Sequence, residues 1–268
     1  MATRSPNAYR GRVGYAEHPP SAALRRHVAC FWTLSGQAGA HRVLPDGCMD
    51  LLFDLGAPRD QGRVIGTMTH AIVADAPAAN GLLGVRFRPG AAMAVGCLAR
   101  EVRDGSFGLD DVWGPIAREI EARVAEAEST AEAVRVLERE LLARLAKVPP
   151  PDARVAYVVA SIEACGGLAR VSALADEANV GERHLVRLFD DHVGVGPKTF
   201  ARVVRVQRVV AAIATELRAR RPPSWAAIAC DVGYADQAHM IRDVRSLAGV
   251  TPAVLAAERA MSDPFNPS

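Results

Sequence analysis

The chain has 268 residues, of which 50% are hydrophobic and 23% charged, and its formal net charge is +2. This length suits one large domain or two ordinary ones, and the apolar fraction predicts well-formed hydrophobic cores. No apolar run approaches the ~20 residues of a membrane span, and no apolar stretch follows the first arginines as in a secretory signal. We therefore expect a cytoplasmic protein without a membrane partner.

The cysteine pattern argues against a disulfide framework and against a zinc knuckle. The five cysteines are scattered, odd in number and form no C-x-x-C pair. We expect them to be buried and reduced. They are Cys30, Cys48, Cys97, Cys165 and Cys230.

The first part of the chain alternates short apolar runs with turn formers such as Pro45-Asp46-Gly47. Runs of this length, rich in Val, Ile, Leu and Phe, are typical of strands. Their spacing predicts a small β-barrel or a sandwich. The predicted strands cover residues 29–34, 41–44, 48–55, 63–67, 71–74 and 82–87.

Helical patterns follow at 91–98, 115–127 and 131–146. In each of the last two, apolar residues recur on one helix face. Two interpretations remain open: the helix pair packs on the barrel, or it forms a dimerisation surface. The apolar positions are Ile116, Ile120 and Val124 in the first helix, and Val134, Leu137, Leu141 and Leu145 in the second.

A small barrel usually offers one concave apolar interior, which is the expected place for a ligand. The alternative is that the same side chains simply form the core. Arg86 and Arg88 alternate with Val85 and Phe87, so they face the other way and either bind an anion or pair with carboxylates. The predicted pocket residues are Trp32, Cys48, Leu52, Phe53, Val85 and Phe87.

The segment Lys147-Val-Pro-Pro-Pro151 is the predicted domain boundary, because consecutive prolines cannot continue a helix and form a stiff connector. We assign 1–147 to an effector or dimerisation domain, 148–151 to the linker, 152–260 to an all-α domain and 261–268 to a tail. The seven helices expected in the α domain cover residues 153–165, 171–178, 182–191, 197–220, 224–231, 236–246 and 252–259.

Two stretches of the α domain read as a short helix, a tight turn and a second helix, which is a helix-turn-helix unit. The first covers residues 171–189 and precedes Gly194-Val-Gly-Pro197; the second covers 224–242 and precedes Gly249-Val-Thr-Pro252. Such a unit presents its second helix to the DNA major groove. Apolar residues anchor that helix inward: Leu185, Leu188 and Phe189 in the first unit, Met240 and Val244 in the second.

The residues left on the outward faces have the chemistry of base recognition. Arginine reads guanine, glutamine reads adenine, and valine or alanine contacts the thymine methyl group. In addition, residues 183–221 contain nine basic and three acidic side chains, which fit either phosphate contact or a solvated helix face. The predicted DNA-binding residues are Arg183, Val186, Arg187, Gln237, Ala238 and Arg242.

The second unit resembles the signature of the AraC/XylS family of bacterial transcription regulators. The matching residues are Ile228-Ala229, Gly233-Tyr234, Asp236-Gln237, His239, Arg242 and Gly249-Val-Thr-Pro252. The first unit matches through Leu174-Ala175, Arg183-His-Leu185, Arg187-Leu-Phe189 and Gly194-Val-Gly-Pro197. Met240 and Val244 depart from the family, which usually has phenylalanines there, so looser packing of the second unit is expected.

The N-terminal half resembles a cupin-like, poorly characterised domain that precedes such units. The resemblance rests on residues 41–53, on 84–90 and on 109–114. His41, Cys48 and His70 are suitable metal ligands by type, but the spacing typical of metal-binding cupins is missing. We expect neither a metal nor another cofactor.

The sequence thus predicts an α+β protein of two domains, a small cupin-like β-barrel with helices followed by an all-α domain of seven helices. Its predicted function is sequence-specific DNA binding in transcription regulation, controlled by a small-molecule effector, without catalytic residues. Double-stranded DNA, the effector, RNA polymerase and a second copy of the chain are the expected partners. The alternatives are a cupin-like enzyme or sensor with a helical appendage, and a helical domain that binds protein.

Overall fold

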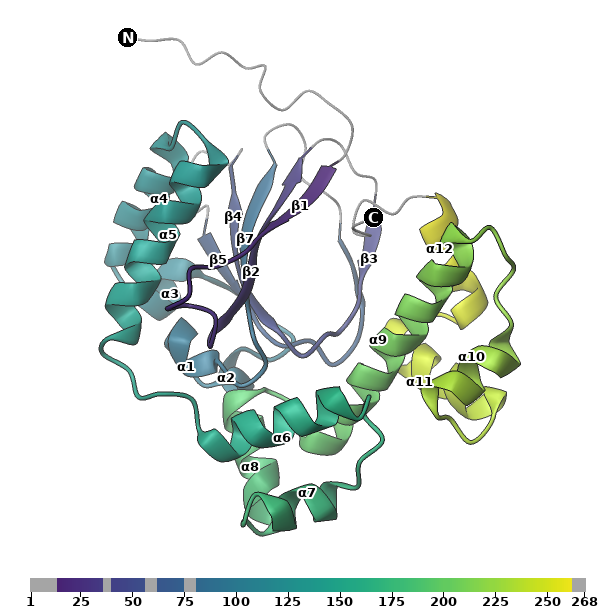
Figure 1. Ribbon diagram of the computed structural model, residues 1–268. Coiled ribbons are helices and arrows are strands. Elements are labelled where there is room, and N and C mark those ends of the chain that lie inside the picture. The colour runs from purple at the N-terminus through teal and green to yellow at the C-terminus, as the bar shows by residue number, and fades with distance from the viewer. Residues whose placement is uncertain (1–13, 36–39, 56–61, 75–80, 262–268) are drawn as a thin grey trace.

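The computed structural model describes residues 14–35, 40–55, 62–74 and 81–261. Within these ranges the N-terminal part is built on antiparallel strands and the C-terminal part is helical, so the predicted α+β class with two parts is confirmed (Figure 1). The predicted tail lies outside the described residues except for Met261. None of the described helices is both long and apolar enough to cross a membrane.

Six strands form one antiparallel sheet, in the order β1-β2-β7-β4-β5-β8. They are β1 (Gly14–His18), β2 (Val28–Ser35), β4 (Met49–Asp54), β5 (Gly62–Ile65), β7 (Leu82–Phe87) and β8 (Ser106–Gly108). A separate antiparallel pair consists of β3 (His41–Val43) and β6 (Ile72–Ala74). The strands β1 and β8 were not predicted, because GYAEH and SFG contain too few apolar residues to give a strand pattern.

The sheet is open, so the prediction of a closed small barrel is wrong. Among the described strands β1 pairs with β2 and β8 pairs with β5, and these two edges do not pair with each other. A barrel needs every strand to have two neighbours. Here one face of the sheet is covered by helices, and Figure 1 shows α4 and α5 along that side.

The main core lies between this face and the helices. Phe31, Val85, Leu51 and Val64 stand opposite one another on β2, β7, β4 and β5, and all four are fully buried. The apolar faces of the two long helices join the same core, as expected for a helix pair packed on the sheet. The helices are α1 (Ala92–Val95), α2 (Ala99–Val102), α3 (Leu109–Trp113), α4 (Ile116–Glu126) and α5 (Thr130–Leu145).

The C-terminal helices form two further cores that share α9. The first core joins α6, α7 and α8 to the start of α9, and the second joins the rest of α9 to α10, α11 and α12. Figure 1 shows α9 running from one helix group to the other. The helices are α6 (Ala153–Ala164), α7 (Val171–Glu177), α8 (Glu182–His192), α9 (Pro197–Arg218), α10 (Trp225–Val232), α11 (Gln237–Ala248) and α12 (Pro252–Met261).

Gly66, just after β5, allows the chain to approach the end of α2 closely. A Cβ atom at this position would lie 1.7 Å from the carbonyl oxygen of Val102. We predict that Gly66→Ala lowers the free energy of unfolding by about 1–3 kcal/mol, because backbone must shift to accept the methyl group. Urea unfolding of the full chain measures this.

Gly196→Ala is the matched control, since no atom lies within 4 Å of a Cβ built there. It should lower the free energy of unfolding by less than Gly66→Ala, by about 0.5 kcal/mol, because only the N-cap preference for glycine before α9 is lost. Equal losses in the two variants would contradict the close approach at Gly66.

Candidate nucleic-acid interface

The first helix-turn-helix unit consists of α7 and α8. The turn between them has Asn179 in the left-handed region, at φ 53°, and Val180 N donates to Ala175 O at 3.0 Å. On α8, Leu185, Leu188 and Phe189 are buried, as predicted. The predicted base-facing residues Arg183, Val186 and Arg187 are exposed on the opposite side of α8. Helical periodicity therefore gives α8 one buried face, which packs in the core, and one exposed face.

The second unit consists of α10 and α11. Gly233 ends α10 at φ 89°, and its N–H donates to the carbonyls of Ala229 and Cys230. Glycine is favoured here because the left-handed conformation strains other residues. The Asp236 carboxylate caps α11 by accepting a hydrogen bond from His239 N at 2.6 Å. The turn and the cap together fix where α11 starts.

On α11 the side chains divide as they do on α8. Met240 and Val244 are both fully buried in the second core. The predicted base-facing residues Gln237, Ala238 and Arg242 are exposed. All six predicted DNA-binding residues thus lie on exposed helix faces, three on each recognition helix.

Three arginines of the predicted basic stripe, all on α9, contact the second unit. Arg202 Nε donates to Asp243 Oδ1 at 3.0 Å, and Arg205 Nη2 lies 3.6 Å from Asp243 Oδ2. Arg208 donates to the carbonyls of Asp231 and Val232 at the end of α10. These three guanidinium groups attach α9 to the second unit, so phosphate contact rests on fewer arginines than the charge count implies.

Asp243 is the centre of this network and the one buried carboxylate of α11. Its neighbour Tyr234 is also buried, which raises the pKa of the phenol well above its usual range, and the nearby Asp243 charge adds to the effect. Arg205 lies over the Tyr234 ring at 5.2 Å. No sequence pattern indicates this network, because Arg202 and Asp243 are 41 residues apart in the chain and meet only in the fold.

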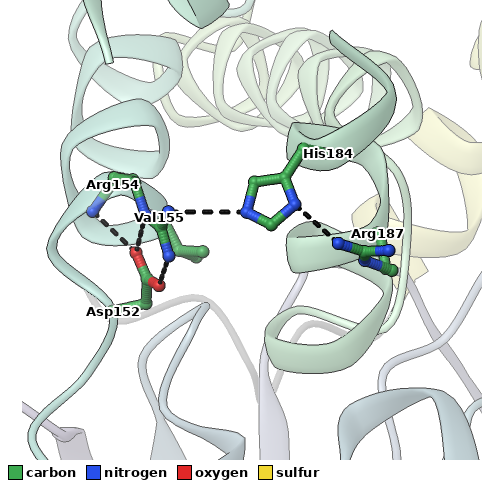
Figure 2. A network of polar contacts seen from close by, with 5 residues as sticks. All are labelled: Asp152, Arg154, Val155, His184 and Arg187. Atoms are coloured by element: carbon green, nitrogen blue, oxygen red, sulfur yellow. Dashed lines mark hydrogen bonds and ion pairs between the residues drawn. The ribbon is translucent and has the colours of Figure 1, made fainter. Parts of the chain in front are cut away.

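A polar chain connects the start of α6 with the recognition helix α8 (Figure 2). The Asp152 carboxylate caps α6 by accepting from Arg154 N and Val155 N, and pairs with the Arg154 guanidinium at 2.5 Å. Arg154 lies 3.4 Å from His184 Nε2, and Arg187 Nη2 lies 2.7 Å from His184 Nδ1. The hydrogen bonds from the Arg154 guanidinium and from the N–H groups of Arg154 and Val155 hold the pKa of Asp152 low, at about 2.

His184 therefore orients Arg187, one of the predicted base readers. A neutral imidazole has one nitrogen that accepts and one that donates, whereas a guanidinium only donates. The Arg187 N–H can donate across the shorter contact only when Nδ1 is the unprotonated ring nitrogen. This places the Arg187 guanidinium on the exposed side of α8 with one of its donors already used.

The six predicted pocket residues do not line one surface. Phe53, Val85 and Phe87 lie in the main core between the sheet and the helices. Trp32 and Leu52 belong to a smaller cluster on the opposite face of the sheet. Cys48 lies near Asp46, Asp50 and Arg86. It therefore belongs with Trp32 and Leu52 on the opposite face. The alternation of strand residues separates the two sets.

The opposite face of the sheet, which we call the polar face, carries a charged group beside Trp32. Arg86 Nε lies 3.5 Å from a carboxylate oxygen of Asp46 and of Asp50, so pairing with carboxylates is confirmed for this arginine. Trp32 Nε1 donates to Asp50 Oδ1 at 2.8 Å. Burial raises the pKa of Asp50 to about 6, although the Arg86 charge acts in the opposite direction.

No group of three or more metal-ligating side chains occurs in the part of the chain that the structure describes. All five cysteines are free thiols. Burial raises the pKa of Cys30 to about 12 and that of Cys97 to about 11, so neither is poised as a thiolate nucleophile.

Comparison with known proteins agrees with this geometry. Residues 174–258 match the model of a helix-turn-helix domain, and residues 16–104 match a domain of unknown function, DUF6597. No curated protein matches the chain.

Solved structures of ToxT from Vibrio cholerae are similar to this chain. An apo variant is 11% identical with a TM-score of 0.44, covering 85% of this chain and 97% of that chain. The protein bound to an unsaturated fatty acid is 11% identical with a TM-score of 0.40, covering 84% and 93%.

The buried carboxylate of α11 gives a direct test of how the second unit is held. We predict that Asp243→Asn lowers the free energy of unfolding by about 1–3 kcal/mol, because two partly exposed guanidinium groups lose the counter-charge of a buried carboxylate. Thermal unfolding of the full chain measures the effect. Asp231→Asn, at an exposed position of α10, is the control and should differ little from wild type; equal stability of both variants would contradict the network.

Proposed function

Residues 174–258 form a helix-turn-helix domain of the AraC type, and from this premise we propose that the protein reads DNA with both of its helix-turn-helix units. The single observation that carries the proposal is the matched pair of exposed faces on α8 and α11, each with two polar side chains and one small apolar one. These are the residue types that recognise base edges in the major groove.

The proposed contacts follow from the chemistry of each side chain. Arg187 and Arg242 would each bind a guanine by two parallel hydrogen bonds, and Gln237 would bind an adenine. Val186 and Ala238 would contact thymine methyl groups, and Arg183 completes the first surface. Two recognition helices attached to one α9 fit successive major-groove segments, about one helical turn apart.

The domain division supports a regulator with separate reading and sensing parts. We propose residues 1–147 as the sensing domain, 148–151 as linker and 152–260 as the DNA-binding domain; Asp152 begins α6 just after the prolines. Such a regulator would act in the cytoplasm and contact RNA polymerase. Self-association through α4 and α5 is a weaker proposal, because their apolar faces are used in the core.

For the effector we propose the polar face of the sheet, at Trp32, Cys48 and Leu52. The Trp32 ring lies close over Gly84, where a Cβ would come 2.0 Å from it, and its N–H is held by Asp50. An aromatic ring fixed beside partly buried charges offers both apolar contact and orientation. The cupin-like character inferred from the sequence stays a prediction.

The DNA-reading proposal predicts that Arg187→Ala or Arg242→Ala costs roughly 1–3 kcal/mol of binding and relaxes the preference at one base pair. The measurement is binding of full-length protein to fragments selected from genomic DNA, followed by a panel with single base changes. Arg139→Ala, exposed on α5 in the N-terminal domain, is the control. An equal loss on every sequence would show phosphate contact instead of base reading.

The effector proposal predicts that small apolar molecules which bind the protein raise its Tm less in Trp32→Phe than in wild type. A ligand at a hundredfold excess over its Kd stabilises the folded state by about 2.7 kcal/mol, so the shift is measurable. A thermal-shift screen of a metabolite collection against both proteins, with Trp225→Phe as control, provides the test. Ligands that stabilise all three proteins equally would place the effector elsewhere.

A further inference from the structure

One short segment of the N-terminal part touches both helix-turn-helix units. Residues 66–71, which we call the bridge segment, connect β5 to β6. Thr67 is fully buried, and its hydroxyl donates to Val193 O after α8 at 2.7 Å. Four residues later, Ala71 N donates to Leu247 O in the last turn of α11, also at 2.7 Å. The two recognition helices are thus joined through a few residues that belong to neither unit.

Side chains of the N-terminal part strengthen the contact at the first unit. Arg103 Nη1 donates to Gly194 O at 3.1 Å and to Asp190 Oδ1 at 2.8 Å. Arg100 forms an ion pair with Asp191. Both arginines come from α2 or directly after it, and both reach the C-terminal end of α8.

The second unit is held in the same way. Arg42, on β3, donates from Nη1 to Ala248 O at 3.1 Å, and from Nε and Nη2 to the Glu258 carboxylate at 2.9 Å each. The neighbouring Leu44 is buried in the second core together with residues of α9 and α11. The guanidinium therefore joins the end of α11 to α12, and Leu44 packs beside it.

The two contacts share one physical principle. The last carbonyls of a helix have no partner within the helix and carry the negative end of its dipole, so N–H groups and guanidinium groups are favourable there. The N-terminal part supplies a hydroxyl and a guanidinium group just after α8, and a backbone N–H and a guanidinium group at the C-terminal end of α11. The first of the exposed side chains proposed to read bases, Arg183 and Gln237, lie at the N-terminal ends of these helices.

The bridge segment is itself held firmly. Thr69 donates from its N–H and its hydroxyl to the two carboxylate oxygens of Asp104, at 2.6 and 2.8 Å. Asp104 N donates to Thr67 O, and Gly66 N donates to Gly105 O, both at 3.0 Å. These four hydrogen bonds attach the segment to the loop after α2, so its two ends cannot move apart independently.

From this geometry we propose that the bridge segment, with Arg42 and Arg103, sets the distance and angle between the two recognition helices, and so determines which spacing of DNA half-elements the protein accepts. The proposal rests on the proposed function, since it assumes that both units read DNA. Without the bridge, α9 is the shared connection, and bending where it meets either unit would change the spacing. With the bridge segment in place, α8 and α11 are connected a second time, through the N-terminal part of the chain.

The test measures affinity against half-element spacing. Duplexes carrying the operator selected by the wild-type protein are made with the spacer one or two base pairs shorter or longer. Full-length wild type should lose about tenfold in affinity away from its best spacing, and Arg42→Glu should lose only about twofold, within the range of coupling between protein sites. Affinity for each isolated half-element should be unchanged.

The reversed pair, Arg42→Glu with Glu258→Arg, restores opposite charges between these two positions but not the hydrogen bond to Ala248 O, so it should recover part of the narrow spacing preference. Thr67→Val, which removes one hydroxyl at the first unit and keeps the side-chain shape, tests the other end if Arg42→Glu does not fold. Arg139→Met on α5 is the control.

An unchanged spacing profile in Arg42→Glu and Thr67→Val would overturn the inference. So would an equal gain or loss of affinity at every spacing, because the contact would then govern affinity and not geometry. If the wild type selected no operator at all, the proposed function itself would be wrong, and the inference would fall with it.

Discussion

The C-terminal half of the molecule depends on a single helix that must bury residues in two cores at once. Near its start, α9 places Phe200 and Ala201 in the first core, and from Val203 to Ile213 it contributes to the second. Its 22 residues form a continuous rod of about 33 Å. A change in its tilt would open one core or the other, so both helix-turn-helix units are tied to its orientation. The polar contacts of Arg202, Arg205 and Arg208 act in the same direction, since they fix the second unit to the rod.

The N-terminal sheet contributes a second constraint, and the way its two faces are used explains how. One face is filled by helices and makes the main core. The polar face carries the group formed by Trp32, Asp50 and Arg86. The turn that leads into β4 reaches α9, where Gln207 Nε2 donates to Pro45 O at 2.6 Å and the Phe200 ring lies against Gly47. The charged residues of the polar face are therefore close in the chain to residues that contact α9.

Much of the helical part follows from local signals in the sequence. Proline is favoured in the first turn of a helix and glycine just after its last turn. Pro197 at the start of α9 and glycine at the ends of α10 and α11 therefore indicate where these helices begin and end. Helical periodicity also separates Leu185 and Met240, which are buried, from Arg187 and Arg242, which are exposed. These residues could be assigned to faces without a structure because the signal lies within one helix.

The pocket and the charge stripe could not be assigned in this way, because both depend on contacts between distant residues. The register of β2, β7 and β4 decides that Phe53 and Val85 face the helices whereas Trp32 faces away. The pairing of Arg202 with Asp243 likewise depends on how α9 crosses α11. A count of charges along the chain includes such an arginine among those that could contact phosphate, although in the fold it is paired with a carboxylate. The bridge segment is a further case, since Thr67 and Ala71 show no pattern before their partners are known.

The central claim is that two recognition helices, held at a fixed separation, read one stretch of duplex. Hydroxyl-radical footprinting of full-length protein on a DNA fragment that it selects tests this most directly. The account predicts two protected windows on one face of the duplex, about 10 base pairs apart from centre to centre. A single window, or protection spread evenly along the fragment, would contradict it.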